Sequence, residues 1–423
     1  MTSRDRVIMA LNHQKPDRVP IDLGATPVSS ISAIMLDKLR KCLNLEPKTV
    51  KVQEPLQFLG SVEKDVIDAL GVDVVGLWSP STFFGYKNSD WKIWRHFSGV
   101  DVMVGRDFTV KENAEGGVYI YPKGDINAHP SGLMPKNGLY FDNVVRQGEI
   151  DYDNLNGRQD FKEDFALFSD EDLRHFEDSC NKLYNDTDYA IIGVYGGASF
   201  GDLAFLSGPG LKETPGIRDI EDWYMAHLLY PEYIKDIYDL QVEIAIENLK
   251  LYKQAVGNKI QAIVVSGTDF GTQNNELISP DLFRDIYKPR FKAVNDWIHE
   301  HTQWKTFYHS CGAITNLLDD MVDMGMDILN PVQCSACGMD PQFLKDKYGE
   351  KLVFWGGGIN TQKTLPFGTP EEVRVEVLER LRIFSEGGGF IIGGIHNIQA
   401  KTPEENLIAF FDAIREFNSQ SAD

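Results

Sequence analysis

A histidine and a cysteine lie two residues apart in the stretch TFYHSCGA, which spans residues 306–313. Because successive side chains of an extended strand point to opposite faces, we expect His309 and Cys311 to share one face. Imidazole nitrogen and thiolate sulfur are ligands that zinc prefers, so the pair could supply two ligands from one short segment. The pair alone is also compatible with a corner of the core that holds two polar side chains.

Three further residues could complete such a site. Cys334 and Cys337 form a C-x-x-C pair after the next apolar run, and His396 follows the last one. A structural zinc site uses four protein ligands, whereas a catalytic site uses three and keeps one position open. The C-x-x-C pair also lies in a loop rich in small residues, where cysteine behaves as a small apolar side chain. In a barrel fold these residues would converge.

Short apolar runs alternate with amphipathic stretches along most of the chain, which predicts parallel strands joined by helices. Eight such runs occur, at residues 19–24, 72–78, 190–197, 262–271, 306–312, 327–333, 352–358 and 389–397. Eight strand–helix units predict an α/β fold of the closed (β/α)8 TIM barrel type. An open, doubly wound sheet is the alternative that the pattern leaves.

One segment interrupts this alternation. Residues 84–150 are rich in aromatic residues and glycine and alternate with a period of two. This pattern predicts antiparallel structure. We interpret the segment as a β-hairpin inserted in an N-terminal βα loop of a single barrel domain that spans residues 1–423.

Polar side chains occur near the ends of nearly all the predicted strands. The active site of a barrel is built from residues at the carboxyl ends of its strands. We therefore predict catalytic roles for Asp269, Gln273 and Asp73, although an Asx turn would also explain Asp269. Substrate-binding residues predicted at the same ends are Tyr195, Asn330, Gln333, Trp355 and Gln399.

Composition narrows the classes of function. The formal net charge of -21 argues against nucleic acid as a partner, because a phosphate backbone requires a basic surface. No apolar run approaches the length of a membrane span, and the N-terminal residues lack the apolar region of a signal peptide. The odd, sparse set of five cysteines is typical of reduced thiols, so we expect a cytoplasmic protein.

Several stretches in this order resemble the uroporphyrinogen decarboxylase superfamily. They are PDRVPID, TDFGTQNNELISPDLFRDIYKPRFK, FYHSCGAI, DILNPVQ, FWGGGINTQ and HNIQAKTPEENLIAFFDAIREF. The closing pattern, a histidine followed by T-P-x-E-N, is the most specific, and the resemblance covers most of the chain outside the insertion. It implies a (β/α)8 barrel, in agreement with the count of strands.

The superfamily contains two kinds of chemistry. Its decarboxylases act on a tetrapyrrole without metal and use paired N-terminal arginines, whereas its corrinoid-linked methyltransferases bind zinc through His-x-Cys and a later cysteine. This chain resembles the methyltransferase branch at His309 and Cys311, but His396 occupies the position of the later cysteine, as in the decarboxylases. After VPID no arginine occurs until Arg40, which disfavours a substrate with many carboxylates.

The resemblance implies a zinc-dependent methyltransferase with metal ligands His309, Cys311 and His396, and with Cys334 and Cys337 as competitors for the third position. The methyl group would pass between a small methoxy or methylthio compound, or a thiol, and a cobalamin or other corrinoid on a separate partner protein. A homodimer is also implied. The alternatives are a metal-free decarboxylase or lyase of a small acid, with Asp269 or Asp73 as its polar group, and a non-catalytic binding barrel.

Overall fold

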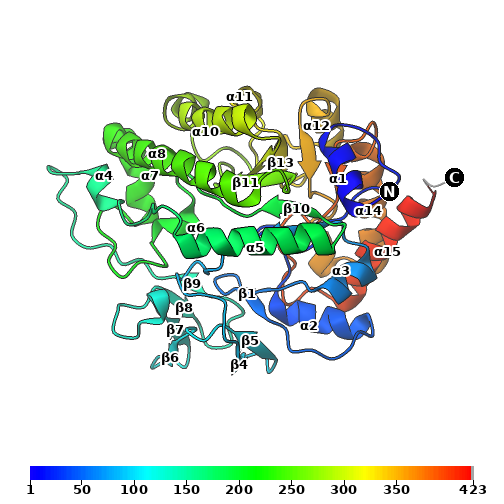
Figure 1. Cartoon of the computed structure of the whole chain (residues 1–423), viewed down its shortest axis with the longest axis horizontal. Coiled ribbons are helices and arrows are strands. Elements are labelled where there is room, and N and C mark those ends of the chain that lie inside the picture. Colours follow the sequence, from blue (N-terminus) through cyan, green and yellow to red (C-terminus); the bar gives the residue numbers. More distant parts are fainter. Residues whose placement is uncertain (421–423) are drawn as a thin grey trace.

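Seven parallel strands form the central sheet of the computed structural model, which describes residues 1–420 (Figure 1). Their order in the sheet follows their order in the chain, as in a barrel built from successive strand–helix units. The strands are β3 (Val74–Leu77), β10 (Ala190–Gly193), β11 (Ala262–Ser266), β12 (Lys305–His309), β13 (Ile328–Asn330), β14 (Val353–Trp355) and β15 (Phe390–Ile391).

Residues 20–22 close this sheet. The N–H of Asp22 donates to Ile392, and the N–H of Ile392 donates to Pro20, on the side of β15. On the other side, the N–H of Asp73 donates to the carbonyl of Ile21, next to β3. The predicted barrel is therefore confirmed, with its first strand reduced to a bridge between the two edges of a seven-stranded sheet.

Helices connect the strands and cover the outside of the barrel (Figure 1). The long helix α8 (Pro231–Val256) buries one side, which includes Ile234, Ile237 and Leu249, and begins with a proline, whose fixed φ suits the first helical turn. The other helices of eight or more residues outside the barrel are α2 (Ala33–Cys42), α5 (Asp170–Asp186), α7 (Ile220–Leu229), α10 (Lys288–His301), α12 (Pro341–Tyr348), α14 (Pro370–Phe384) and α15 (Glu404–Gln420). Shorter turns are α3 (Lys64–Leu70), α4 (Gly157–Asp160), α6 (Leu203–Leu206), α9 (Pro280–Leu282), η2 (Phe283–Tyr287), α11 (Leu318–Asp323) and α13 (Thr364–Phe367).

The first helix, α1 (Ser3–Leu11), fills the amino-terminal end of the barrel. Its side chains Val7, Ala10 and Leu11 are buried in one cluster with the inward-facing side chains of the strands, among them Phe307 and Trp355. The interior is thus a packed apolar core and not a channel, and only the carboxyl ends of the strands are left to form a site.

The insertion contains two antiparallel sheets instead of the single hairpin that the sequence predicted. Strands β4 (Lys92–Arg95) and β5 (Asp101–Val104) form one sheet. The second sheet has four strands, β6 (Val110–Glu112), β7 (Val118–Ile120), β8 (Gly132–Met134) and β9 (Asp142–Asn143), and the short turn η1 (Pro122–Gly124) joins β7 to β8. A separate pair, β1 (Val52–Glu54) and β2 (Leu59–Gly60), packs against β5. No strand of the insertion belongs to the barrel sheet within residues 1–420.

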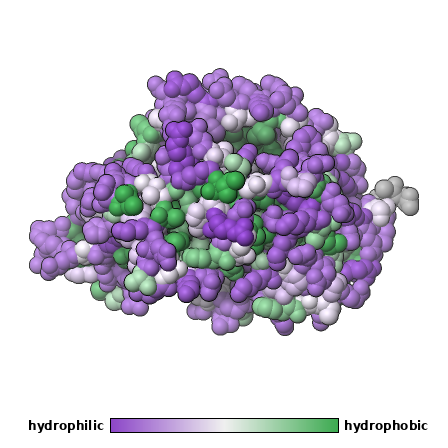
Figure 2. All heavy atoms as spheres, turned by 90° about the horizontal axis from the view of Figure 1, so that it is seen from below, coloured by the Kyte–Doolittle hydropathy of each residue, from purple (hydrophilic) through white to green (hydrophobic). Residues whose placement is uncertain are grey.

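Hydrophilic residues dominate the face shown in Figure 2, and hydrophobic residues appear between them in small groups. Among residues 1–420, no helix combines the length and the apolar character that crossing a bilayer requires.

Candidate metal centre

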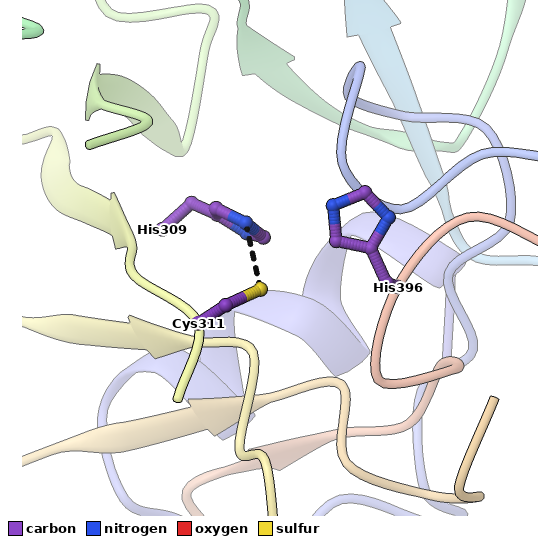
Figure 3. A group of neighbouring side chains, drawn as sticks. All are labelled: His309, Cys311 and His396. Carbon is purple, nitrogen blue, oxygen red and sulfur yellow. Dashed lines mark hydrogen bonds between the residues drawn. The ribbon is translucent and has the colours of Figure 1, made fainter. Parts of the chain in front are cut away.

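The side chains of His309, Cys311 and His396 converge at the carboxyl ends of the strands (Figure 3). His309 is the last residue of β12, Cys311 follows it in the loop, and His396 comes from the loop after β15. Sγ of Cys311 lies 3.4 Å from Nε2 of His309, and the centroids of the two imidazole rings are 5.2 Å apart. One potential ligand atom from each of the three residues lies within 4.8 Å of the other two.

This donor set fits a zinc ion. Bonds of about 2.0–2.1 Å to nitrogen and 2.3 Å to sulfur place neighbouring ligands of a tetrahedral zinc roughly 3.3–3.6 Å apart. His309 and Cys311 already have that spacing. Two imidazoles and one thiol make three ligands and leave one position for a substrate or water, which is the arrangement of catalytic zinc. Within residues 1–420 no other group of three histidine, cysteine or acidic side chains meets this geometry.

Asn330, the last residue of β13, fixes the tautomer of His309. The Nδ2 group of Asn330 donates to the carbonyl of Trp355 at 2.9 Å, which turns Oδ1 toward Nδ1 of His309 at 2.6 Å. Because Oδ1 can only accept, Nδ1 of His309 must carry the proton. Nε2 then keeps its lone pair, which faces Cys311, and is ready to bind a metal.

Burial keeps both histidines neutral. Desolvation lowers the pKa of His309, and the neighbouring carboxylate of Asp269 only partly opposes it. The pKa of His396 falls to about 3, because of burial first and of nearby His309 second. Burial and the negative charge of Asp269 raise the pKa of the Cys311 thiol well above its ordinary value. Neutral imidazoles are the form that binds zinc, whereas the thiol requires a cation beside it to ionise.

Asp269 and a second carboxyl group, Asp202, flank the site. Oδ1 of Asp269 accepts from the backbone N–H of Cys311 at 2.7 Å and lies 3.6 Å from Nε2 of His309. Asp202 precedes α6 and caps it, because its Oδ1 accepts from the N–H of Ala204, and its Oδ2 lies next to Gly267. Burial, with a smaller effect from Asp269, raises the pKa of Asp202 to about 7. Asp202 could not be found from the sequence because its loop has no motif; only the packing of that loop onto residues 267–268 reveals it.

Two glutamines hold the loop that follows His309. Oε1 of Gln333 accepts from the N–H of Gly312 at 2.8 Å, and its Nε2 donates to Oε1 of Gln273. Gly312 has a φ of 92°, and any side chain at this position would collide with the backbone of Gly271. Gln273 itself is exposed and also donates to the carbonyl of Ser335. The two residues therefore position the loop that carries Cys311.

Asp73 lies at the opposite end of the barrel, so its predicted place at a strand exit was wrong. It precedes β3 instead of following it, and it is fully buried. Its carboxylate forms ion pairs with Arg6 at 2.6 Å and Arg18 at 2.8 Å and accepts from the N–H of Ile21. The polar residue of the run VDVVGLW thus stabilises the amino-terminal end of the barrel.

Three other predicted residues have hydrogen bonds and ring contacts that do not involve the side chains of His309, Cys311 or His396. Tyr195 packs between Phe168 and Tyr252, and its hydroxyl donates to the carbonyl of Ala245. The indole of Trp355 lies in the barrel core, where its Nε1 donates to Asp22 at 2.8 Å. Gln399 is exposed, and its side chain donates to the carbonyl of Asn397. Their predicted substrate-binding roles receive no support from these positions.

The C-x-x-C pair does not join the cluster. Cys334 donates to the carbonyl of Val332, and burial raises its pKa to about 12. Cys337 is exposed, and its backbone N–H donates to the carbonyl of Gln273. Of the competing third ligands, only His396 is grouped with His309 and Cys311.

Comparisons with known proteins agree with this fold. A family model described as uroporphyrinogen decarboxylase (URO-D) matches residues 168–417. Uroporphyrinogen decarboxylases from Psychromonas ingrahamii and Pseudoalteromonas translucida are 32% and 31% identical over 89 and 91 residues, which are 20% and 21% of this chain. These matches span 24% and 25% of the length of those relatives. A solved methyltransferase from Methanosarcina mazei aligns over 99% of both chains at 17% identity, with a TM-score of 0.53, which shows a shared fold.

Proposed function

The chain belongs to the uroporphyrinogen decarboxylase family, and we propose that it is a zinc-dependent methyltransferase within that family. It would transfer a methyl group between a small methoxy or methylthio compound, or a thiol, and a corrinoid on a separate protein. The convergence of His309, Cys311 and His396 is the observation that carries this proposal. Two neutral imidazoles beside a thiol are a suitable zinc-binding set.

His309, Cys311 and His396 would hold the zinc. When bound, zinc supplies Lewis-acid chemistry: it polarises the heteroatom that carries the methyl group, or it favours ionisation of a thiol. The remaining steps belong to the side chains around it. Asn330 keeps a proton on Nδ1 of His309, so that Nε2 stays a lone-pair donor.

The two carboxyl groups would handle the proton of the substrate. Asp202, with a pKa of about 7, can carry a proton near neutral pH and give it to a leaving heteroatom, or take one from an attacking thiol. Asp269 is half-exposed and already holds the N–H of Cys311, so it would orient a substrate donor while it fixes the loop. Its partners would be a corrinoid protein and a second copy of this chain, as in the methyltransferase branch that the chain resembles.

Metal content and methyl transfer test the proposal together. Protein purified without added metal should contain about one zinc per chain, and chelation should abolish the demethylation of methylcobalamin by a thiol, which added zinc should restore. Cob(I)alamin with methoxy and methylthio compounds tests the other direction. Protein that never binds zinc but releases CO2 from a small carboxylic acid would replace the proposal with the decarboxylase alternative. Zinc binding without turnover in either assay would favour a binding barrel.

A further inference from the structure

A buried carboxyl group lies inside the barrel core, on the segment that closes the sheet. Asp22 is 2% exposed, and its Oδ2 accepts from Nε1 of Trp355 at 2.8 Å. Its Oδ1 accepts from the N–H of Ala25 at 3.2 Å. No lysine or arginine among residues 1–420 forms an ion pair with it, and burial raises its pKa to about 6. Burying a carboxyl group without a cation beside it is costly, so packing alone does not account for Asp22 at this position.

The hydrogen bonds of Asp22 continue to the candidate metal centre. Trp355 is held at two points, because Asp22 accepts from its indole and Asn330 donates to its carbonyl at 2.9 Å. Asn330 in turn accepts from Nδ1 of His309. All four residues are at most 2% exposed. A continuous, buried series of hydrogen bonds therefore runs from residues 20–22, through β14 and β13, to the end of β12.

We propose that Asp22 is a positioning residue for the metal centre, acting through Trp355 and Asn330 on the orientation and tautomer of His309. The carboxylate of Asp22 accepts from three donors, Nε1 of Trp355, the N–H of Ala25 and the side chain of Ser29. Asparagine has one oxygen and cannot satisfy all three, so Asp22→Asn should loosen Trp355. The carbonyl of Trp355 is what turns Oδ1 of Asn330 toward His309. Any effect of these hydrogen bonds on methyl transfer rests on the proposed function, whereas their effect on the arrangement of His309 does not.

Two variants break the same bond from opposite ends. Asp22→Asn removes an acceptor, and Trp355→Phe removes the donor while an aromatic ring remains in the barrel, so the second also serves if the first folds poorly. Tyr308→Phe is the matched control. Tyr308 is on β12, the strand that ends at His309, but its hydroxyl donates to Asn295 of helix α10 at 2.7 Å, so the variant removes a buried hydrogen bond that does not belong to the series from Asp22 to His309.

The tautomer of His309 is measured from the ¹⁵N chemical shifts of its ring in protein labelled with ¹⁵N-histidine, freed of metal by a chelator and kept at one neutral pH. The signals of His309 are assigned by their loss in His309→Gln. Zinc affinity is measured by competition with a chromophoric chelator. In Asp22→Asn and Trp355→Phe, His309 should lose its single Nδ1–H tautomer, and zinc should bind roughly tenfold more weakly. The double variant should be no weaker than the more affected single variant, because the two residues act through one bond.

Three outcomes would overturn the inference. In the first, both variants keep the His309 shifts and a zinc affinity within about twofold of wild type. In the second, Tyr308→Phe has effects as large as theirs. In the third, the losses in zinc affinity add up in the double variant. If wild-type protein binds no zinc while the His309 tautomer still depends on Asp22, the proposed function fails and the positioning role stands. If zinc binds and supports transfer but the tautomer ignores Asp22, the positioning role alone fails.

Discussion

Oδ1 of Asn330 lies 2.6 Å from Nδ1 of His309, and the orientation of the Asn330 amide is fixed from its other side by the carbonyl of Trp355. Both residues are almost fully buried. The contact decides which nitrogen of His309 is available, because an accepting oxygen leaves the proton on Nδ1 and the lone pair on Nε2.

Replacing Asn330 with alanine should therefore weaken zinc binding by about 10- to 100-fold, as expected when the partner of a ligating histidine is lost. Chelator competition measures the change, and circular dichroism checks that the barrel remains folded. Asn295→Ala provides a control with an amide of similar burial that is bonded to Tyr308. Wild-type affinity in Asn330→Ala would show that His309 does not need this partner.

The identity of the third ligand is the subject of a second prediction. His396→Ala should lower zinc occupancy as strongly as Cys311→Ala, because each removes one of three ligands. Cys337→Ala should leave occupancy close to wild type, since this exposed cysteine is outside the cluster. Elemental analysis of the purified variants measures occupancy. A site emptied by Cys337→Ala but retained by His396→Ala would reverse the assignment.

Asp73 should matter for stability and not for chemistry. Asp73→Asn removes the charge that Arg6 and Arg18 share, whereas Arg6 keeps its ion pair with Asp17 at 2.7 Å. The free energy of unfolding should therefore fall by about 1.5–3 kcal/mol, the range for hydrogen bonds to charged groups. Urea denaturation measures this loss, and zinc content should be unchanged. If the variant instead retained its stability and lost only turnover, Asp73 would have the catalytic role that its position contradicts.

The pH dependence of stability should reveal Glu54, which is buried at the end of β1. Its carboxyl oxygens accept from the N–H groups of Leu56 and Phe83, both at 3.0 Å, and burial raises its pKa from 4.5 to about 8. Between these values the unfolded chain loses the proton that the folded chain keeps. The free energy of unfolding should therefore fall as pH rises through this window, by at most about 5 kcal/mol.

The glutamine in Glu54→Gln cannot ionise, so the contribution of residue 54 to the free energy of unfolding should not change with pH. Denaturant titrations near pH 5 and near pH 8 should show a larger loss for wild type than for Glu54→Gln. Because the variant keeps only one acceptor for two N–H groups, it should be less stable than wild type at the acidic end. Parallel pH profiles of the two proteins would mean that Glu54 does not titrate in this range.

The barrel could be predicted because each of its strands is a short apolar run followed by a break. Seven of the eight predicted runs contain a barrel strand, and the first, residues 19–24, forms only a bridge between the edges of the sheet. The ends of the runs were harder to interpret. In VDVVGLW the polar residue precedes the strand, and in AIIGVYGG the tyrosine after the strand turns into an aromatic cluster. Alternation along one strand does not determine which end of the barrel a flanking residue reaches.

His309, Cys311 and His396 could be brought together from the sequence because two of them share a strand exit and a resemblance supplied the third. Asp22 lies in the predicted first strand, but the role proposed for it could not be inferred from the sequence, and neither could that of Asp202, since both depend on contacts with distant loops and strands. Their importance depends on burial and on which donors face them, and neither property has a signature in local sequence.

Closure of the barrel has a consequence for how the protein is made. Residues 20–22 are synthesised long before their partner Ile392. Until Ile392 has been made, Val7, Ala10 and Leu11 of α1 have no complete barrel to enter, so the nascent chain exposes their apolar surface. The barrel therefore cannot close before β15 is synthesised, and chaperones that shield nascent chains should stay bound to this protein until that strand has emerged.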